Sequence, residues 1–279
     1  MIGYDDTILT MLDLNTTETL VLTYSLILMF FFGLFSLLAE VFPNVKGQHI
    51  LRKGMGTDLI YWFLTPLLYV QISQWILFGV TFLFFLDAIK YREFSSHGLG
   101  IFASLPIAIQ FIISILIMNI IEYWMHRLFH GRTLWKIHSI HHSTKELDWL
   151  SGVRFHPLNM IAHSIFAGTL VFVLGFSPIV YILRFPFDVI YAAMVHANLN
   201  WTFGPLRYIF ASPVFHRFHH TGVDEGGERN FAPHLSIVDL LFGTFYMPTN
   251  RLPAHFGVAE SVPEGFFEQL IYPFKRTQE

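Results

Sequence analysis

The sequence contains no cysteine in its 279 residues. This absence excludes disulfide bonds, thiolate metal sites and thiol-based catalysis. Charged residues are scarce as well, because Asp, Glu, Lys and Arg together make up 13% of the chain, against about 25% in an average soluble protein. The 17 basic and 20 acidic residues leave a net charge of −3 with histidine neutral. There is no basic excess of the kind that binds nucleic acid, so no nucleic-acid partner is expected.

Hydrophobic residues fill the place of the missing charges. They make up 53% of the chain, and the mean hydropathy is +0.51. A membrane-spanning helix needs about 20 consecutive apolar residues. The sequence therefore predicts an all-α integral membrane protein with about five transmembrane helices. The five predicted spans are residues 20–42, 59–86, 101–123, 158–175 and 178–195.

A proline, a turn-like segment and a pair of charged residues occur within or between these spans. Residues 59–86 exceed the length of one span and contain Pro66, so this stretch either tilts, kinks or forms a hairpin. The last two spans are separated by a turn-like segment, 175–178, and read as a helical hairpin. Arg184 and Asp188 lie four residues apart in the last span. Charges within a membrane are usually paired, so an ion pair is predicted, with a role in a pocket as the alternative.

The distribution of basic residues predicts the orientation. Lysine and arginine gather after the first span, in the segment that follows residue 123, and in the tail after residue 206. Because cytoplasmic loops are enriched in these residues, we expect a cytoplasmic cap formed by residues 124–157 and 196–279, with the N-terminus outside. Lys90 and Arg92 count against this orientation. No linker or repeat divides the chain, so residues 1–279 are expected to form a single membrane domain.

Histidines crowd into about one third of the chain, at the predicted membrane face that carries the cap. Spacings of three and four residues place imidazoles on one side of a helix. Neutral imidazole binds zinc, copper, iron and nickel, and the spacing does not choose among them. So many donors exceed the needs of one ion, so two metals are predicted. The clustered histidines are His126, His130, His138, His141, His142, His196, His216, His219 and His220.

The sequence around these histidines resembles the fatty acid hydroxylase (sterol desaturase) superfamily. The matching stretches are 123–130, 134–143, 212–220, 230–231 and 239–245, within a region from about Glu122 to Pro248. The resemblance implies a di-iron centre that uses O2 to hydroxylate or desaturate an unactivated C–H bond of a lipid. Carried over position by position, it also implies that all nine clustered histidines are metal ligands.

One position departs from the pattern. Some members of this superfamily have a further histidine four residues after the position of His196, where this chain has Asn200. The Asn200 side chain is expected to offer an oxygen ligand, to hold a metal-bound water, or to cap a helix.

Four further residues are predicted to support the ligands. Glu122 lies one helical turn before His126 and is expected either to accept its second N–H or to be an interfacial carboxylate. Asp239 precedes an apolar run and is expected to cap a helix or to hold the cap against the histidines. Arg154 and His156 precede the fourth span and are expected either to act near the metals or to provide polar packing.

The remaining polar candidates are two residues that follow His156 and four isolated histidines. Asn159 and His163 follow His156 at helical spacing and share its face, which is predicted to point toward the metals. The isolated histidines are interpreted as surface or packing residues. They are His49, His97, His234 and His255.

The predicted function is an O2-dependent di-iron monooxygenase that oxidises a membrane lipid such as a sterol or a fatty acyl chain. Two iron ions and O2 are the expected cofactor and co-substrate. The sequence has no haem-binding His-Pro-Gly-Gly motif, no dinucleotide-binding fingerprint and no cysteine cluster, so a separate reductase or small electron carrier is expected. A metal-dependent lipid hydrolase that uses metal-bound hydroxide is the alternative. A metal transporter is less favoured, because the histidines gather at one face.

Overall fold

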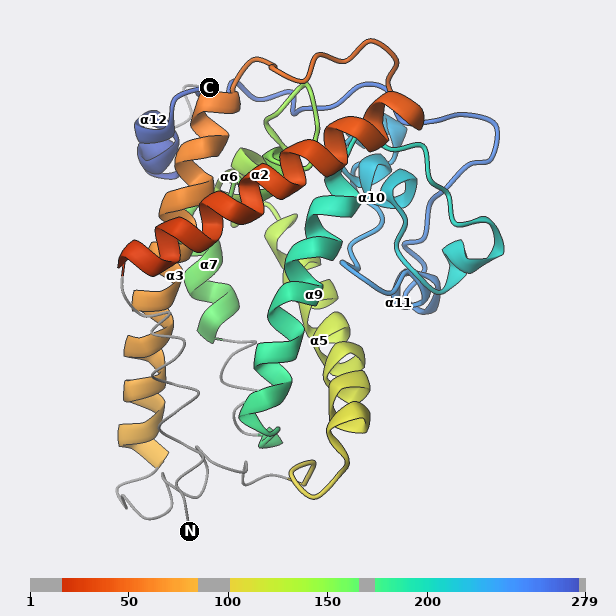
Figure 1. Cartoon of the computed structure of the whole chain (residues 1–279). Helices are drawn as coiled ribbons and strands as arrows, with labels where there is room; N and C mark the ends of the chain where they lie inside the picture. Colours follow the sequence, from red (N-terminus) through yellow and green to blue (C-terminus); the bar gives the residue numbers. More distant parts are fainter. Residues whose placement is uncertain (1–16, 85–100, 166–173, 276–279) are drawn as a thin grey trace.

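The computed structural model describes residues 17–84, 101–165 and 174–275 (Figure 1). Within these residues every regular element is a helix, which confirms the all-α prediction. Four helices are long, and the others are short and lie mainly among the histidine-bearing segments. The long helices are α2 (Thr17–Val41), α3 (Met55–Phe84), α5 (Ile107–Phe129) and α9 (Pro178–His196).

Helix α5 differs from the predicted span in both of its ends. It begins at Ile107 rather than at residue 101, because Pro106 is its N-cap and the preceding residues form turns. It also continues past residue 123 to Phe129, with His130 as its C-cap. His126 therefore lies in the last turn of a long apolar helix, and His130 directly follows that turn.

The second and fourth predicted spans lie partly within the described residues. Helix α3 is one continuous helix that contains Pro66, so it does not form a hairpin between Met55 and Phe84. Residues 85 and 86 of the predicted span lie outside the described residues. Helix α7 (Pro157–His163) begins the fourth predicted span, of which residues 166–173 also lie outside the described residues. The expected turn before α9 is present, with Gly175 at φ +67° and Pro178 in the first turn of the helix.

Three described helices are long and apolar enough to cross a membrane, namely Glu18–Val41, Ile107–Phe129 and Ile179–His196. Their outward side chains include exposed large apolar residues such as Phe30, Ile112 and Ile182. Such surfaces favour contact with lipid rather than water. The protein is therefore a membrane protein, while the count of five spans and the cytoplasmic position of the cap stay predictions.

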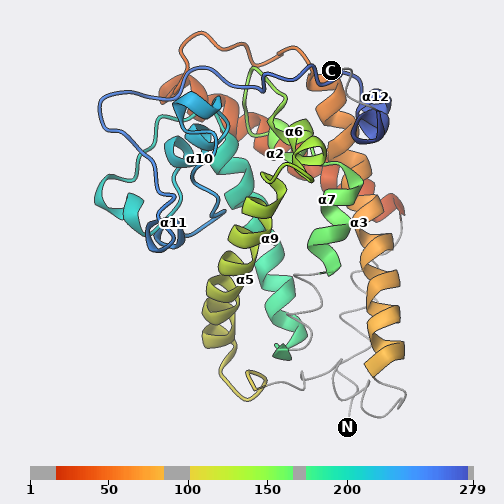
Figure 2. The ribbon, with the colours of Figure 1, turned by 180° about the vertical axis from the view of Figure 1, so that it is seen from behind.

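The long helices differ in direction. Helices α5 and α9 run side by side in the same chain direction. The axis of α3 is roughly parallel to theirs at some distance, with the opposite chain direction, and α2 crosses the others obliquely (Figures 1 and 2). An aromatic cluster holds α2 in place, because Phe31 and Phe35 of α2 pack against Trp149, and Phe31 also contacts Trp62 of α3. The indole N–H of Trp62 also donates to the carbonyl of Tyr24 at 3.0 Å.

The remaining helices gather near one end of α5 and α9 (Figure 2). Three of them frame the histidines: α6 (Trp135–His142), α10 (Pro213–His219) and α11 (Ile237–Leu241). Helix α12 (Phe266–Ile271) covers α3, where Phe266 packs on Tyr61. Short 3-10 turns connect these elements at Ser151–Val153, Gly204–Tyr208, Val223–Glu225 and Tyr272–Phe274.

A buried network of ion pairs joins this end of the protein to α3. Asp58 of α3 accepts from Arg52 and from Arg154, each at 2.6 Å, and Arg52 also pairs with Asp148 at 2.6 Å. Arg154 also donates to the hydroxyl of Ser143, the residue that follows α6. Because these charges are buried and mutually paired, they fix α3 against the segment that follows the histidines of α6.

Candidate metal centre

The nine clustered histidines come together in two groups. In the first group, one ring nitrogen from each of five histidines lies within 4.8 Å of the others. In the second group, four histidines meet the same limit. The first group is His126, His130, His138, His142 and His219, and the second is His141, His196, His216 and His220. The groups adjoin, because the rings of His142 and His220 stack with centroids 4.4 Å apart.

The two short helices contribute to both groups in a reciprocal way. Each carries the pattern His-x2-His-His, in which the first and last imidazoles are four residues apart and the middle one is three from the first. At about 100° per residue, the first and last side chains lie about 40° apart, and the middle one points to the other side. In α6 the middle histidine, His141, belongs to the second group, whereas the other two belong to the first. In the α10 pattern the middle histidine, His219, belongs to the first group, whereas the other two belong to the second.

Backbone carbonyls determine which ring nitrogen faces the centre of the first group. His126 Nδ1 lies 2.8 Å from the Phe231 carbonyl, and His219 Nδ1 lies 2.7 Å from the Arg229 carbonyl. A carbonyl only accepts, so each Nδ1 carries the hydrogen and each Nε2 has a free lone pair. The two Nε2 atoms lie 2.8 Å apart. Two lone pairs at this distance repel each other, and a shared metal cation would turn this repulsion into coordination.

The second group repeats this arrangement. His196 Nδ1 donates to the Ala192 carbonyl at 2.7 Å, so its Nε2 lone pair faces Nε2 of His216 at 3.0 Å and Nε2 of His141 at 3.3 Å. His220 Nε2 lies 3.2 Å from His216 Nε2. In the first group, Nε2 of His130, His138 and His142 is buried with no hydrogen-bond partner among the described residues.

Such buried, unpartnered nitrogens are rare in proteins unless an ion satisfies them. The donor set contains only imidazole nitrogen and fits two metal ions.

Burial keeps these imidazoles in the form that binds metal. Removal from water lowers the pKa of each clustered histidine in α6 and α10 well below its usual value, and the neighbouring histidines lower it further. The same two causes lower the pKa of His130. Neutral imidazole is therefore the expected form at pH 7, and it is the form that coordinates a cation.

Two neighbouring side chains position the ligands. Asn159 of α7 is one of them, because its Oδ1 lies 3.0 Å from His138 Nδ1. Asp239 accepts hydrogen bonds from the backbone N–H groups of Phe231 and Ala232, both at 2.8 Å, and so holds the loop whose Phe231 carbonyl orients His126. Burial raises the pKa of Asp239, although its hydrogen bonds to Thr244 and to these N–H groups oppose the rise.

Arg217 is a functional neighbour that the sequence analysis missed. It was counted among the basic residues of the tail, yet it is completely buried between His216 and the end of α9. Its Nη1 donates to the carbonyls of His196, Ala197 and Leu147 at 2.9 to 3.2 Å. Burial lowers the pKa of Arg217 to about 9, so the guanidinium stays charged at neutral pH. It ties α10 to the carboxyl end of α9, where a cation is favourable.

Asn200 lies beyond the end of the helix that carries His196. Helix α9 ends at His196, so a separation of four residues no longer places Asn200 on the same helical face. Asn200 is exposed, and its backbone N–H donates to the Phe42 carbonyl at 3.0 Å. We therefore leave it out of the proposed ligand set.

Three of the predicted supporting residues have other partners. Glu122 pairs with His163 at 3.1 Å, while the Phe231 carbonyl takes the N–H of His126 that Glu122 was expected to accept. Arg154 belongs to the ion-pair network around Asp58. His156 is the N-cap of α7: its Nδ1 accepts from the Leu158 N–H, and its Nε2 lies 3.1 Å from the Leu270 carbonyl. The last two residues therefore stabilise the segments around the site.

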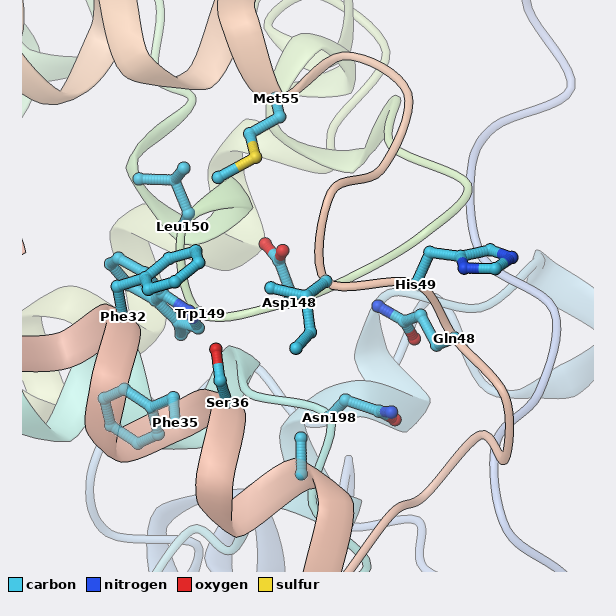
Figure 3. Close-up of a pocket in the computed structure, with 12 residues that line it drawn as sticks. Phe32, Phe35, Ser36, Gln48, His49, Met55, Asp148, Trp149, Leu150 and Asn198 are labelled. Atoms are coloured by element: carbon cyan, nitrogen blue, oxygen red, sulfur yellow. The ribbon is translucent and has the colours of Figure 1, made fainter.

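A surface pocket lies away from this centre, between α2 and the segment 148–150 (Figure 3). None of the nine clustered histidines lines it. Asp148, which borders it, is already paired with Arg52.

We compared the chain with known proteins and protein families. The model of the family "Fatty acid hydroxylase" matches residues 111–244, which include all nine clustered histidines. The matched region and the curated relatives support the fatty acid hydroxylase superfamily as the family of this region. An ornithine lipid hydroxylase of Rhizobium tropici is 31% identical over 172 residues, which cover 61% of this chain and 52% of the relative.

Two further members of the superfamily show its range. An alkylglycerol monooxygenase of Homo sapiens is 32% identical over 124 residues, or 44% of this chain and 27% of the relative. A Delta(7)-sterol 5(6)-desaturase of Gibberella zeae is 26% identical over 140 residues, or 50% of this chain and 38% of the relative. The chain thus spans about half the length, or less, of these three relatives. No solved structure shows significant similarity to it.

Proposed function

We propose that this protein is an O2-dependent di-iron oxidoreductase that hydroxylates or desaturates a C–H bond of a membrane lipid. The observation that carries the proposal is the pair of adjacent, buried, all-histidine groups at the ends of apolar helices. The names of the three relatives support a lipid substrate, because they describe a lipid hydroxylase, an alkylglycerol monooxygenase and a sterol desaturase.

In this proposal each histidine group holds one iron. Iron would supply the redox chemistry with O2 that oxidation of an unactivated C–H bond requires, since side chains alone do not provide it. The protein would hold the ligands rigid, with backbone carbonyls fixing the tautomers of His126, His196 and His219. Buried aromatic neighbours such as Phe231 keep bulk water away from the first group.

The position of the ligands supports a substrate that approaches from the bilayer. His126 lies in the last turn of α5, and His196 is the last residue of α9, so two apolar helices lead directly to the two groups. A lipid chain that lies along these helices would bring its carbons close to the metals. We place this end of the helices at the cytoplasmic face, on the distribution of basic residues.

Electrons for the reaction would come from a separate reductase or small electron carrier. The chain has no cysteine for an iron–sulfur cluster, so it lacks the most common protein-borne one-electron carrier. The partner would dock on the cap, which carries the histidines.

The test is turnover by the purified, iron-loaded protein in lipid nanodiscs, with a chemical reductant and 18O2. The expected result is lipid consumption that requires both O2 and reductant. Hydroxylation would place the label in the lipid, whereas desaturation would lower its mass by two hydrogens and place the label in water. Equal conversion without O2 and reductant would support a lipid hydrolase and contradict the proposal.

A matched pair of substitutions assigns the activity to the histidine groups. His141→Ala removes one ligand of the second group and should abolish turnover without preventing membrane insertion. His255→Ala is the control, because the His255 side chain is 85% exposed and pairs only with Glu225 at the surface. Equal activity of the two variants would remove His141 from the proposed ligand set.

A further inference from the structure

A second polar assembly lies among the apolar helices, beside the metal centre. Its five members come from α5, α7, α9 and the loop before α11, and we call it the intramembrane polar cluster. His163 Nε2 lies 3.1 Å from Glu122 Oε1, and His234 lies between the two carboxylates, with Nδ1 3.8 Å from Glu122 and Nε2 3.4 Å from Asp188. The predicted ion pair is present: Arg184 Nη2 lies 2.9 Å from Asp188.

The cluster adjoins the first histidine group. Glu122 precedes His126 by four residues on α5, which corresponds to the same face of the helix and a rise of about 6 Å. The His234 backbone is fixed in this place, because Asn119 of α5 accepts from the N–H groups of His234 and Leu235 at 3.0 and 2.9 Å. A molecule bound at the cluster would therefore lie about one helical turn from a proposed metal ligand.

The internal contacts leave part of the hydrogen-bonding capacity of the cluster unused. Glu122 Oε2 and Arg184 Nε are buried without a hydrogen-bond partner among the described residues. The Arg184 side chain is only 9% exposed. Two carboxylates face one guanidinium. The cluster therefore has more carboxylates than guanidinium groups and leaves one buried acceptor, Glu122 Oε2, without a donor among the described residues.

Exposure differs among the members of the cluster. The side chains of His163 and Asp188 are 39% and 36% exposed, whereas those of Glu122 and His234 are 16% and 8% exposed. Two members are thus within reach of a molecule outside the protein, and two are largely buried. Charged groups within apolar helices are costly and in most proteins mark a functional site, so structural pairing alone does not account for a partly exposed, unsatisfied cluster.

We propose that the intramembrane polar cluster binds the hydrogen-bond-donating head of an amphiphilic lipid, a hydroxyl or a protonated amine, and so holds the carbons nearest that head at the metal centre. The proposal deepens the proposed function and rests on it. Glu122 Oε2 and the Asp188 carboxylate would accept the donors of the head. The oxidised carbon would then lie close to the polar head rather than at the far end of the chain.

The experiment measures lipid binding by the metal-loaded protein in nanodiscs, without O2 or reductant, so that no turnover occurs. The probes are 1-O-hexadecylglycerol, hexadecylamine and 1-O-hexadecyl-2,3-di-O-methylglycerol, whose methylated oxygens cannot donate. At least one donor probe should bind about tenfold more tightly than the methylated probe, as expected for a hydrogen bond to a charged group. The variants Glu122→Gln and Asp188→Asn should each reduce this preference several-fold.

Glu264→Gln is the matched control, because Glu264 is 69% exposed and pairs with Lys53 at the surface. It should retain the full preference. A stronger preference for hexadecylamine identifies an ammonium head, and one for hexadecylglycerol identifies a hydroxyl head.

Two results would overturn the proposal. One is equal binding of all three probes by the unsubstituted protein. The other is an unchanged preference in both cluster variants, and a lower melting temperature of these variants would then make the cluster purely structural. Since binding is measured without turnover, a protein that binds selectively but does not oxidise lipid would refute the proposed function and leave the binding site in place.

Discussion

Asn159→Leu should weaken one metal site and spare the other. Asn159 Oδ1 lies 3.0 Å from His138 Nδ1, and His138 belongs to the first histidine group. Leucine has a similar volume but no acceptor, so the N–H of His138 would be left buried and unpaired. Such a group costs about 1–3 kcal/mol, which corresponds to roughly 5- to 150-fold in metal affinity. This range agrees with the roughly 10- to 100-fold effect of changing a residue that supports a metal ligand.

The assay is a competition titration with a chelator, with bound metal counted by mass spectrometry. The unsubstituted protein should lose its two metals over a narrow range of chelator concentration. Asn159→Leu should pass through a state with one metal, because the second histidine group does not contact this residue. Asn159→Asp keeps an acceptor and should restore the unsubstituted behaviour. Identical titrations for the leucine variant and the unsubstituted protein would refute the role of Asn159, and simultaneous loss of both metals would refute the independence of the groups.

Three further predictions concern packing, charge and pH. An added methyl at Gly152 would lie 2.8 Å from the His196 ring. Gly152→Ala should therefore destabilise the protein by about 1–3 kcal/mol in urea unfolding and reduce its metal content. Gly56→Ala is the control, because its added methyl meets no atom within 4 Å and should change neither quantity. Asp58→Asn leaves the buried Arg52 without one of its two carboxylates and should cost about 3–5 kcal/mol; an unchanged melting temperature would show that the network is dispensable. The metal-free protein should lose stability as the pH falls below about 6.5, because histidines in the unfolded chain bind protons that the buried ones, with their lowered pKa, do not. At pH 5.5 each buried histidine should lower the free energy of unfolding by about 1.4 kcal/mol. Equal urea midpoints at pH 7.5 and 5.5 would contradict this reasoning.

The features that could be predicted from the sequence are those set by local periodicity and composition. The apolar stretches became helices because about 20 consecutive apolar residues favour a helix in lipid whatever surrounds them. The ion pair of Arg184 and Asp188 followed from a spacing of four residues on one helix. The nine clustered histidines could be listed as one set because they recur at short spacings within about one third of the chain, a pattern that is visible before any tertiary contact forms.

The errors occurred where a residue was assigned a partner across a distance in the chain. Glu122 was assigned to His126 by its spacing, but in the folded protein the Phe231 carbonyl reaches His126 from a loop that Asp239 holds. His234 was interpreted as an isolated residue, because nothing near it in the sequence shows that it lies between two carboxylates of other helices. Because α9 ends at His196, the spacing of four residues does not determine the direction of the Asn200 side chain.

The sequence by itself therefore determined that this is a helical membrane protein with a histidine-rich candidate metal centre, since both properties follow from residue types and short-range spacing. Only the tertiary structure decided how the histidines divide. The middle histidines of the two His-x2-His-His patterns, His141 and His219, each join the group to which their own helix contributes fewer ligands. A helix determines only the angle between its own side chains, so the packing of α6 against α5, α9 and α10 decides which nitrogens meet.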